Sequence, residues 1–436
     1  MHYGKRIFLY KIWNFSVTPI EEVMNTVDRA VTDGFNAIAV HILWSRAQPR
    51  ADEYDFEPYD RMLDYIINVK GLPVIILVDF CRFTRMLDRD GVLLSDEVQR
   101  DRFGNVGAGG AFESRVMPSF ASGSAMKKMI GFLRRTVTHF NDKYGKKVLY
   151  YLAANTPYCE TEYWCTGGYD YSEAAKQGFS LYLKDIFGNT ENLNNTFHTG
   201  YASFEEIIPP DCSDVGNMLS LYWYIYRHKM LKRFIDSCAD TVHDICSDKG
   251  TGFSVQFGST IDQSILLRGT VMFWELCEKA DLVWVDDAPD YNHAFSCDYT
   301  LSNLPCGAYL AQEIDGPSQT GATPEKYQKQ GLECFGHGCQ VVGIANWFMD
   351  DKYERYRPVW RSIRDNCLDG HEESSEVSYS EVITVKLSRL LHDGDADEVR
   401  RQYEMLSAGE DKCIKINIEN DLNSIISGLG GKIPEK

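Results

Sequence analysis

The sequence lacks the features that mark membrane, secreted and metal-dependent proteins. No run of 18 apolar residues occurs, so we expect no membrane-spanning helix. The first residues lead straight into a strand pattern and contain no apolar segment long enough for a signal peptide. The 13 cysteines are odd in number and follow neither a disulfide framework nor a metal-ligand spacing. These absences predict a reduced, cytoplasmic protein with no metal and no cofactor.

Basic residues are also in deficit. The chain has 45 Lys and Arg against 63 Asp and Glu, which gives a net charge of −18. Such an excess of negative charge argues against nucleic acid and against an anionic membrane as partners. Hydrophobic residues make up 44% and charged residues 25% of the chain, which is ordinary for a soluble globular protein.

Eight short apolar runs alternate with segments of helical periodicity. The runs are Ile7–Tyr10, Ala37–Leu43, Val74–Val78, Val148–Ala154, Phe253–Phe257, Leu282–Val285, Gly307–Gln312 and Val341–Ala345. Nearly continuous apolar runs are typical of parallel strands that are covered on both faces. The 436 residues also suit an eight-unit barrel, which takes roughly 250 residues or more, with insertions and a small appendage. We therefore predict a (β/α)8 TIM barrel over residues 1–369.

The remaining residues, 370–436, predict a small C-terminal α/β unit. A polar linker over residues 370–381 precedes a strand at Val382–Val385, a helix around residues 395–407 and a strand at Cys413–Ile416. Three elements make a poor independent core. We expect this tail to pack on the barrel or on another subunit.

Two of the apolar runs lead into carboxylates. Glu313 closes the seventh run, and Glu160 follows Asn155 at the end of the fourth, with Glu162 close behind. The carboxyl ends of barrel strands converge on the face that carries the active site. Two carboxylates there suit glycoside hydrolysis, in which one protonates the leaving oxygen and the other attacks or activates water. The structural alternatives are an ion pair of Glu313 with Arg46 or Arg115, and a solvated loop position for Glu160 or Glu162.

Aromatic residues surround the second acid, at Tyr158, Tyr163, Trp164, Tyr169 and Tyr171. Sugar rings stack on aromatic planes, so this composition suits a carbohydrate site. Trp44 and Trp347 follow strands two and eight and are expected at the same face, although each could equally fill the core. The long excursion over residues 81–123 predicts a lid or binding loop.

Several segments resemble glycoside hydrolase family 42, the β-galactosidases of clan A. They are Trp44 with Gln48-Pro49 and Tyr54-Asp55-Phe56, Glu113-Ser114-Arg115 with Pro118, Gly178–Gly188 with Glu191–Asn194, Phe204–Pro210, Gln312-Glu313 and Ala345-Asn346-Trp347. The resemblance implies a (β/α)8 barrel, Glu313 as the nucleophile and Arg115 as a substrate ligand. The tail is similar to the beginning of the family's flavodoxin-like trimerisation module but stops early, so a homo-oligomer is possible and its size stays open.

One departure from the family affects the acid/base. The clan has Glu directly after the Asn that ends strand four, whereas Thr156 follows Asn155 here. The stretch Pro157-Tyr158-Cys159-Glu160 instead resembles the catalytic-acid loop of β-amylases. On that similarity we assign Glu160 as the acid/base, with Glu162 as the alternative.

The sequence therefore predicts a retaining, exo-acting β-glycosidase that resembles β-galactosidases and acts on an oligosaccharide or glycoside. Glu313 and Glu160 are its catalytic residues. Its substrate-binding residues are Asn155, Arg115, Trp347, Trp44, Glu162, Gln256 and Asp286, with His41 and Asp79 as further strand-end candidates. The alternatives are a catalytically inactive barrel that binds carbohydrate or a protein partner, and an inverting glycosidase.

Overall fold

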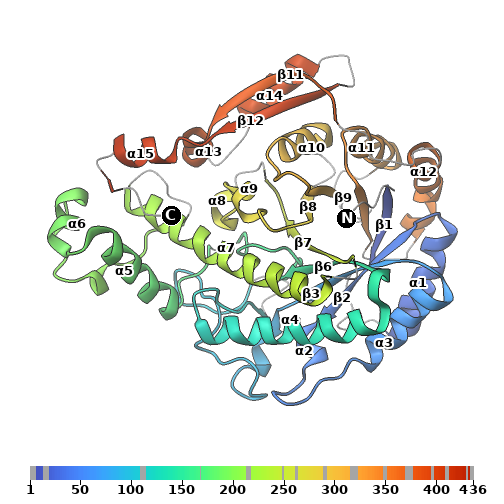
Figure 1. Ribbon diagram of the computed structural model, residues 1–436, viewed down its shortest axis with the longest axis horizontal. Coiled ribbons are helices and arrows are strands. Elements are labelled where there is room, and N and C mark those ends of the chain that lie inside the picture. Colours follow the sequence, from blue (N-terminus) through green and yellow to red (C-terminus); the bar gives the residue numbers. More distant parts are fainter. Residues whose placement is uncertain are drawn as a thin grey trace.

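Eight parallel strands close into a barrel, as the sequence predicts, in a computed structural model of the chain (Figure 1). The order around the barrel is β1-β10-β9-β8-β7-β6-β3-β2. These strands are β1 (Ile7–Ile12), β2 (Ala37–Leu43), β3 (Val74–Asp79), β6 (Val148–Ala154), β7 (Gly252–Phe257), β8 (Leu282–Asp287), β9 (Tyr309–Ile314) and β10 (Val341–Asn346). The structure describes residues 6–12, 19–108, 114–166, 168–212, 218–247, 250–260, 264–287, 292–314, 323–346, 351–368, 377–393, 397–407, 412–428 and 431–432.

Side chains alternate between the inside and the outside of the barrel, as strand geometry requires. One apolar cluster fills the interior and includes Leu9, Ile75, Leu77, Leu152 and Trp284. The intervening residues belong to a second cluster that packs under the surrounding helices. The interior is therefore a packed core, and any site must lie above it at one end of the strands.

A ring of helices covers the outside of the barrel (Figure 1). These helices are α1 (Ile20–Thr32), α3 (Glu57–Asp64) with its π-helical continuation η1 (Tyr65–Val69), α4 (Gly123–Tyr144), α7 (Met218–Cys246), the short α8 (Ile265–Arg268) and α9 (Phe273–Leu276), α10 (His293–Leu301), α11 (Pro324–Gly336) and α12 (Asp351–Cys367).

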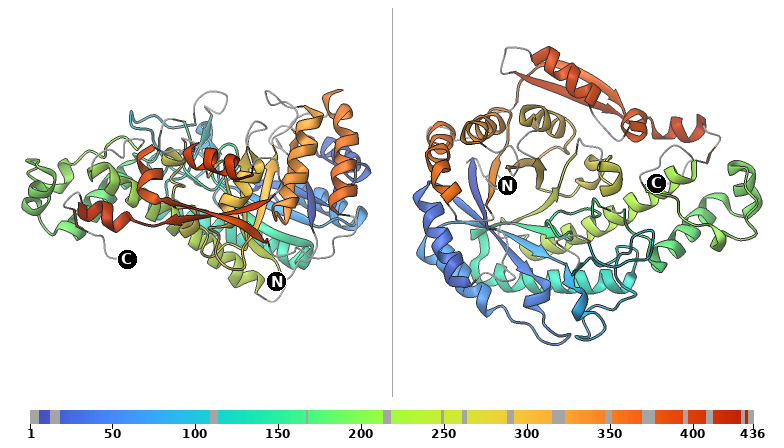
Figure 2. Two further views of the ribbon diagram at one scale, coloured as in Figure 1. Left: turned by 90° about the horizontal axis from the view of Figure 1, so that it is seen from above. Right: turned by 180° about the vertical axis from the view of Figure 1, so that it is seen from behind.

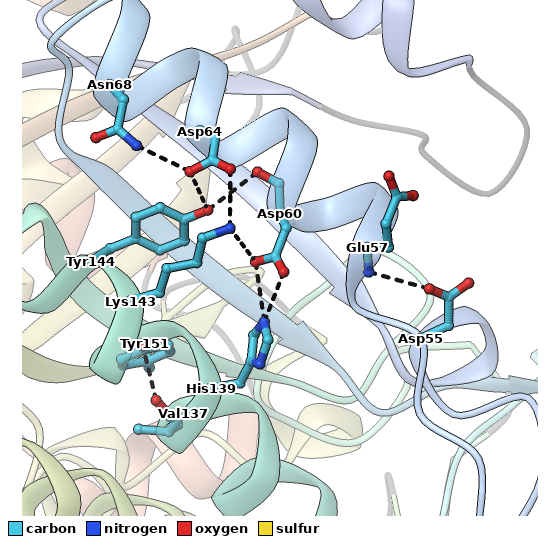
Figure 3. A network of polar contacts seen from close by, with 10 residues as sticks. All are labelled: Asp55, Glu57, Asp60, Asp64, Asn68, Val137, His139, Lys143, Tyr144 and Tyr151. Atoms are coloured by element: carbon cyan, nitrogen blue, oxygen red, sulfur yellow. Dashed lines mark hydrogen bonds and ion pairs between the residues drawn. The ribbon is translucent and has the colours of Figure 1, made fainter.

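Polar contacts join neighbouring helices of this ring. Lys143 Nζ lies 3.0 Å from Asp64 Oδ2 and 3.2 Å from Asp60 Oδ1, and His139 Nε2 lies 3.1 Å from Asp60 (Figure 3). The Tyr144 hydroxyl donates to Asp64 at 3.1 Å, so α3 and α4 are held together along their solvent side.

The long excursion over residues 81–123 forms a two-stranded hairpin, β4 (Arg82–Phe83) with β5 (Arg115–Val116). Its backbone accepts hydrogen bonds from the loop after β6, Trp164 Nε1 to Ala108 O at 2.6 Å and Tyr169 OH to Gly107 O at 2.7 Å. Further along the chain, α5 (Glu173–Phe187) and α6 (Thr190–Phe197) extend away from the barrel beside the start of α7 (Figures 1 and 2).

The tail contains a parallel pair of strands, β11 (Tyr379–Lys386) and β12 (Cys413–Glu419), with α13 (Leu387–Asp393), α14 (Asp397–Ser407) and α15 (Leu422–Gly428). It lies against α10 on the outside of the barrel (Figure 2). Asn303 Nδ2 donates to Ile416 O at 2.8 Å, and Ile414 N donates to Asp298 Oδ2 at 2.6 Å. Among the described helices, none combines the length and apolar character needed to cross a bilayer.

Candidate active site

Six polar residues point into the barrel at the carboxyl ends of its strands. Each lies two residues along the strand from an inward-facing apolar or small side chain, so the same alternation that fills the core places it above the core. They are Lys11 on β1, His41 on β2, Asp79 on β3, Gln256 on β7, Asp286 on β8 and Glu313 on β9. Strand register pairs Asp286 with Glu313 on adjacent strands. Five of these residues, His41, Asp79, Gln256, Asp286 and Glu313, are candidates from the sequence that the structure places at this face, and Lys11 is a sixth.

Glu313 lies at the centre of this layer. Its side chain is 2% exposed, and its Oε2 accepts from Lys11 Nζ at 2.6 Å and from Gln256 Nε2 at 3.0 Å. Lys11 also donates to Gln256 Oε1 at 3.2 Å and lies 5.6 Å from the centre of the Trp284 ring. The three polar side chains thus form a closed hydrogen-bonded triangle above the barrel core.

Lys11 was not among the predicted site residues. Burial acts to lower its pKa, but the negative charges of Glu313 and Asp286 and the hydrogen bond to Glu313 outweigh this and raise the pKa, so the ammonium is retained. A lysine on the inward face of an otherwise apolar strand is costly without a partner, and that pattern in residues 7–12 was the available sequence signal. The structural alternative for Glu313 was an ion pair with Arg46 or Arg115, and its ion-pair partner is Lys11.

Glu160 is brought back to the barrel by a tight loop after β6. Asn155 N and Thr156 N donate to Glu160 O at 2.9 and 3.2 Å, and Cys159 N donates to Thr156 O at 2.9 Å. Cys159 adopts φ +79°, in the left-handed region. Residues 156–159 therefore form a closed turn, and the turn puts Glu160 beside Asn155, the residue that follows β6. Glu160 is 3% exposed, and its carboxylate accepts from the Thr156 hydroxyl.

The pKa of Glu313 is raised above its ordinary value. Burial is the largest influence and raises it, Lys11 lowers it, and the negative charge of Glu160 raises it. A nearby like charge disfavours the ionised form, so Glu160 acts on Glu313 in the direction expected of a neighbouring carboxylate.

Hydrogen-bonding capacity is left over at this place. Among the described residues, the buried Asn155 Oδ1 and Trp284 Nε1 have no hydrogen-bond partner. Asn155 Nδ2, by contrast, is used to donate to Glu162 O at 3.0 Å. A buried acceptor and a buried donor without protein partners are suited to a polar ligand.

Glu162 has its own set of partners. It is fully buried, forms an ion pair with Arg268, and its Oε2 accepts from Gly258 N at 3.0 Å. Burial raises the pKa of Glu162 to about 8, although Arg268 acts to lower it. These contacts assign Glu162 to holding the loop after β6 against β7, contrary to its predicted role in substrate binding.

Arg115 and Asp79 form a pair at the edge of the site. Arg115 Nη2 lies 2.6 Å from Asp79 Oδ2, and the arginine side chain is 14% exposed. Next to them, Cys159 Sγ lies 3.1 Å from His41 Nδ1. Burial, together with the charges of Lys11 and Arg115, holds the pKa of His41 well below its ordinary value, so the ring is neutral.

The aromatic residues are placed differently from the prediction. Tyr163, Trp164, Tyr169 and Tyr171 are buried, and each donates its polar hydrogen to a backbone carbonyl of a neighbouring segment. Tyr158 alone among the five is exposed, at 37%, and its ring lies 4.9 Å from that of Trp164.

Trp44 is a core residue, which corrects the prediction that it faces substrate. It is fully buried, packs on Phe132 of α4 at a ring distance of 5.6 Å and donates to Gln48 Oε1 at 2.7 Å. The chain turns outward after Leu43 into the short helix α2 (Trp44–Ala47), which carries the indole away from the barrel axis. Trp347, predicted as the platform under the sugar ring, lies outside the described residues.

Residues 127–282 match the model of glycoside hydrolase family 42, described as β-galactosidase. The predicted resemblance is confirmed. The matched segment includes β6, the Glu160 loop and β7. With it, the predicted enzyme class, a glycoside hydrolase, is confirmed.

Solved structures share the fold. The chain is similar to the β-galactosidase of the psychrophilic Marinomonas ef1, with TM-score 0.69 and 17% identity over 94% of this chain and 70% of that one. The β-galactosidase of Halorubrum lacusprofundi gives TM-score 0.71 and 15% identity over 98% and 72%. The catalytic domain of β-amylase from Paenibacillus polymyxa gives TM-score 0.65 and 13% identity over 82% of this chain and 98% of that one. At these identities the likeness establishes the barrel fold alone.

Proposed function

We propose that the protein is a retaining, exo-acting β-glycosidase, resembling the β-galactosidases, in which Glu313 is the nucleophile and Glu160 the acid/base. The proposal is supported by two observations: Glu313 is a buried carboxylate at the carboxyl end of β9, paired with Lys11 and Gln256, and the loop after β6 returns the buried Glu160 to Asn155 at the end of β6. The family match over residues 127–282 supports the same reaction class.

The surroundings of Glu313 suit a nucleophile. A carboxylate attacks the anomeric carbon only when it is ionised, and burial alone would favour its protonated form. The Lys11 ammonium at 2.6 Å opposes that effect and favours the ionised form, while the pKa of Glu313 stays above its ordinary value. Gln256 holds the same oxygen, which leaves Oε1 as the attacking atom.

Glu160 would protonate the leaving oxygen and then activate water. Its loop sets it directly beside Asn155, although Thr156 occupies the position next to that asparagine. The Thr156 hydroxyl donates to one carboxylate oxygen and so orients the group. Glu162 is the weaker candidate because its carboxylate is already paired with Arg268.

Asn155 and Tyr158 are the proposed substrate contacts. The unpartnered Asn155 Oδ1 would accept a sugar hydroxyl, and the exposed Tyr158 ring offers a face on which a sugar can stack. Arg115 and Asp286 would contact substrate from the rim of the same layer, and Arg115 would do so while it remains paired with Asp79.

The decisive experiment separates the two carboxylates on activated aryl glycosides. We expect Glu313→Gln to lower turnover by at least about 10⁴-fold, because the covalent step is lost. We expect Glu160→Ala to lose turnover of substrates with poor leaving groups. Azide should rescue this variant, because the azide anion attacks the glycosyl-enzyme without needing a base to activate it. Glu162→Gln is the matched control: it should keep the turnover of the wild type on substrates with poor leaving groups and should not respond to azide. Activity of Glu313→Gln within tenfold of wild type would remove the nucleophile assignment.

Stereochemistry tests the retaining mechanism independently. Retaining enzymes place their carboxyl groups about 5–5.5 Å apart and inverting ones about 6.5–9.5 Å apart. Proton NMR of the first-formed anomer should show the β-anomer; the α-anomer would favour the inverting alternative.

The inactive-barrel alternative is favoured by one observation, the closed Lys11–Gln256–Glu313 triangle. If no aryl glycoside is turned over while calorimetry still detects saccharide binding, the barrel is a binding protein.

A further inference from the structure

Three cysteine sulfurs meet where the outer helices α10 and α11 adjoin the turn before β10. They belong to Cys297 on α10, Cys334 on α11 and Cys339 in the turn before β10. All three sulfurs lie within 4.8 Å of one another, and Cys297 Sγ is 3.4 Å from Cys339 Sγ. The three side chains are 0%, 0% and 1% exposed.

We propose that Cys297, Cys334 and Cys339 bind one thiophilic metal ion of the Zn²⁺ or Cu⁺ class. Thiolate sulfur is the ligand that these closed-shell ions prefer. A tetrahedral site with metal–sulfur bonds of about 2.3 Å separates its sulfurs by about 3.8 Å. The observed 3.4 Å separation and the 4.8 Å limit on the group bracket that value.

The turn that carries two of the ligands is built to hold them together. Cys334 and Cys339 enclose the sequence Phe-Gly-His-Gly, and Cys339 N donates to Cys334 O at 3.0 Å. Gly338 has φ +90°, and a Cβ there would lie 2.4 Å from a methyl carbon of Val377, so only glycine fits. Two cysteines are therefore fixed by a short backbone turn, and α10 supplies the third.

The cluster is shielded from solvent, because none of the three cysteine side chains is more than 1% exposed. Cys238 on α7 is also buried but belongs to no such group in the described part of the chain.

His337 does not supply a fourth ligand as the structure stands. Its Nδ1 is 2.8 Å from Asp298 Oδ1, and Cys413 hydrogen-bonds to the ring. Zn²⁺ in structural sites takes four ligands, so its binding would require His337 or a water to complete the set. Cu⁺ would need only the three sulfurs.

Metal binding is tested on the full chain, reduced and kept free of oxygen, by titration of Zn²⁺ and separately of Cu⁺ against chromophoric chelators. We expect one equivalent per chain, and the tighter-bound ion identifies the member of the class. Cys339→Ser should weaken binding by at least about 100-fold, whereas the control Cys238→Ser should leave it unchanged. Equal binding by wild type and Cys339→Ser would overturn the proposal.

A measurement on the wild type avoids the risk that a cysteine variant misfolds. X-ray absorption of the loaded protein should show a shell of three sulfur atoms at about 2.3 Å. A shell of nitrogen and oxygen only, or a Cys297–Cys339 disulfide with no metal uptake by the reduced chain, would contradict it.

Discussion

The mouth of the barrel and the contact between α10 and the C-terminal tail (the tail junction) each bury a carboxylate beside a cation. The two places differ in how many carboxylate oxygens still lack a hydrogen-bond donor. At the mouth, Glu313 is paired with Lys11. At the junction, Asp298 on α10 is paired with His337.

The oxygens of Asp298 are fully used. Oδ1 accepts from His337 Nδ1 at 2.8 Å, and Oδ2 accepts from the Tyr403 hydroxyl at 2.9 Å and Ile414 N at 2.6 Å. Two of these donors belong to the tail, so the carboxylate fastens α14 and β12 to the barrel. At the mouth, Glu313 Oε1 and the nearby Asn155 Oδ1 keep accepting capacity. A buried carboxylate whose oxygens all accept hydrogen bonds from the protein holds structural elements together. One with an oxygen that is still able to accept a hydrogen bond is suited to bind a ligand.

Replacing Lys11 should produce the largest effect on function. In Lys11→Met, Glu313 keeps its burial and the repulsion from Glu160 but loses the opposing positive charge, so its pKa rises. Because the nucleophile must be ionised, kcat/KM at neutral pH should fall by about 10²–10³-fold, and the acidic limb of the pH–rate profile should move to higher pH.

Lys70→Met is the matched control. Lys70 pairs with Asp28 on the outer helices at 2.7 Å, outside the barrel. Its replacement should leave the profile in place. An unmoved acidic limb in Lys11→Met would show that the ion pair does not set the charge of Glu313.

Replacing Asp298 should affect stability instead of catalysis. Asp298→Asn leaves His337 charged and buried without its counterion, which costs about 3 kcal/mol in the free energy of unfolding. Denaturant titration measures the loss, and limited proteolysis should cut the tail first. A kcat within twofold of wild type is expected; a large fall in kcat with an intact tail would place Asp298 in the site.

The junction should also make stability depend on pH. Burial acts to lower the pKa of His337, but Asp298 and Cys413 raise it to about 11, from 6.5 in the unfolded chain. A raised pKa contributes stability that is complete below pH 6.5 and is lost as the pH rises toward 11. The stability difference between wild type and His337→Gln should therefore shrink between pH 6.5 and 9, and a difference that grows over this range would contradict the assignment.

The fold was predictable because each barrel strand is a nearly continuous apolar run in the sequence. All eight strands lie where the sequence placed them, with ends shifted by one or two residues. The tail strands β11 and β12 contain the predicted Val382–Val385 and Cys413–Ile416, and the tail lies against α10, whereas the sequence left open whether it packs on the barrel or on another subunit. Burial on both faces leaves a pattern in the sequence that needs no tertiary information.

The site was predictable only in part, because direction and pairing depend on packing. Glu313 and Glu160 lie at the predicted face. Lys11 was missed because an isolated lysine does not reveal its partner 302 residues away. Trp44 was misplaced because one residue past the strand end is enough to change which side of the wall a side chain faces.

Two aromatic residues test, with the smallest expected effects, which side chains contact substrate and which only stabilise the fold. Tyr158 is exposed beside the Glu160 loop, and Trp44 is buried against Phe132. Tyr158→Ala should raise KM by about five- to tenfold through loss of a stacking face worth about 1 kcal/mol, with the free energy of unfolding nearly unchanged. Trp44→Phe should do the reverse, lowering stability by about 1–2 kcal/mol through a lost hydrogen bond and lost packing while KM stays within twofold. Michaelis–Menten kinetics and thermal unfolding of both variants decide the matter, and a raised KM in Trp44→Phe would return that residue to the substrate.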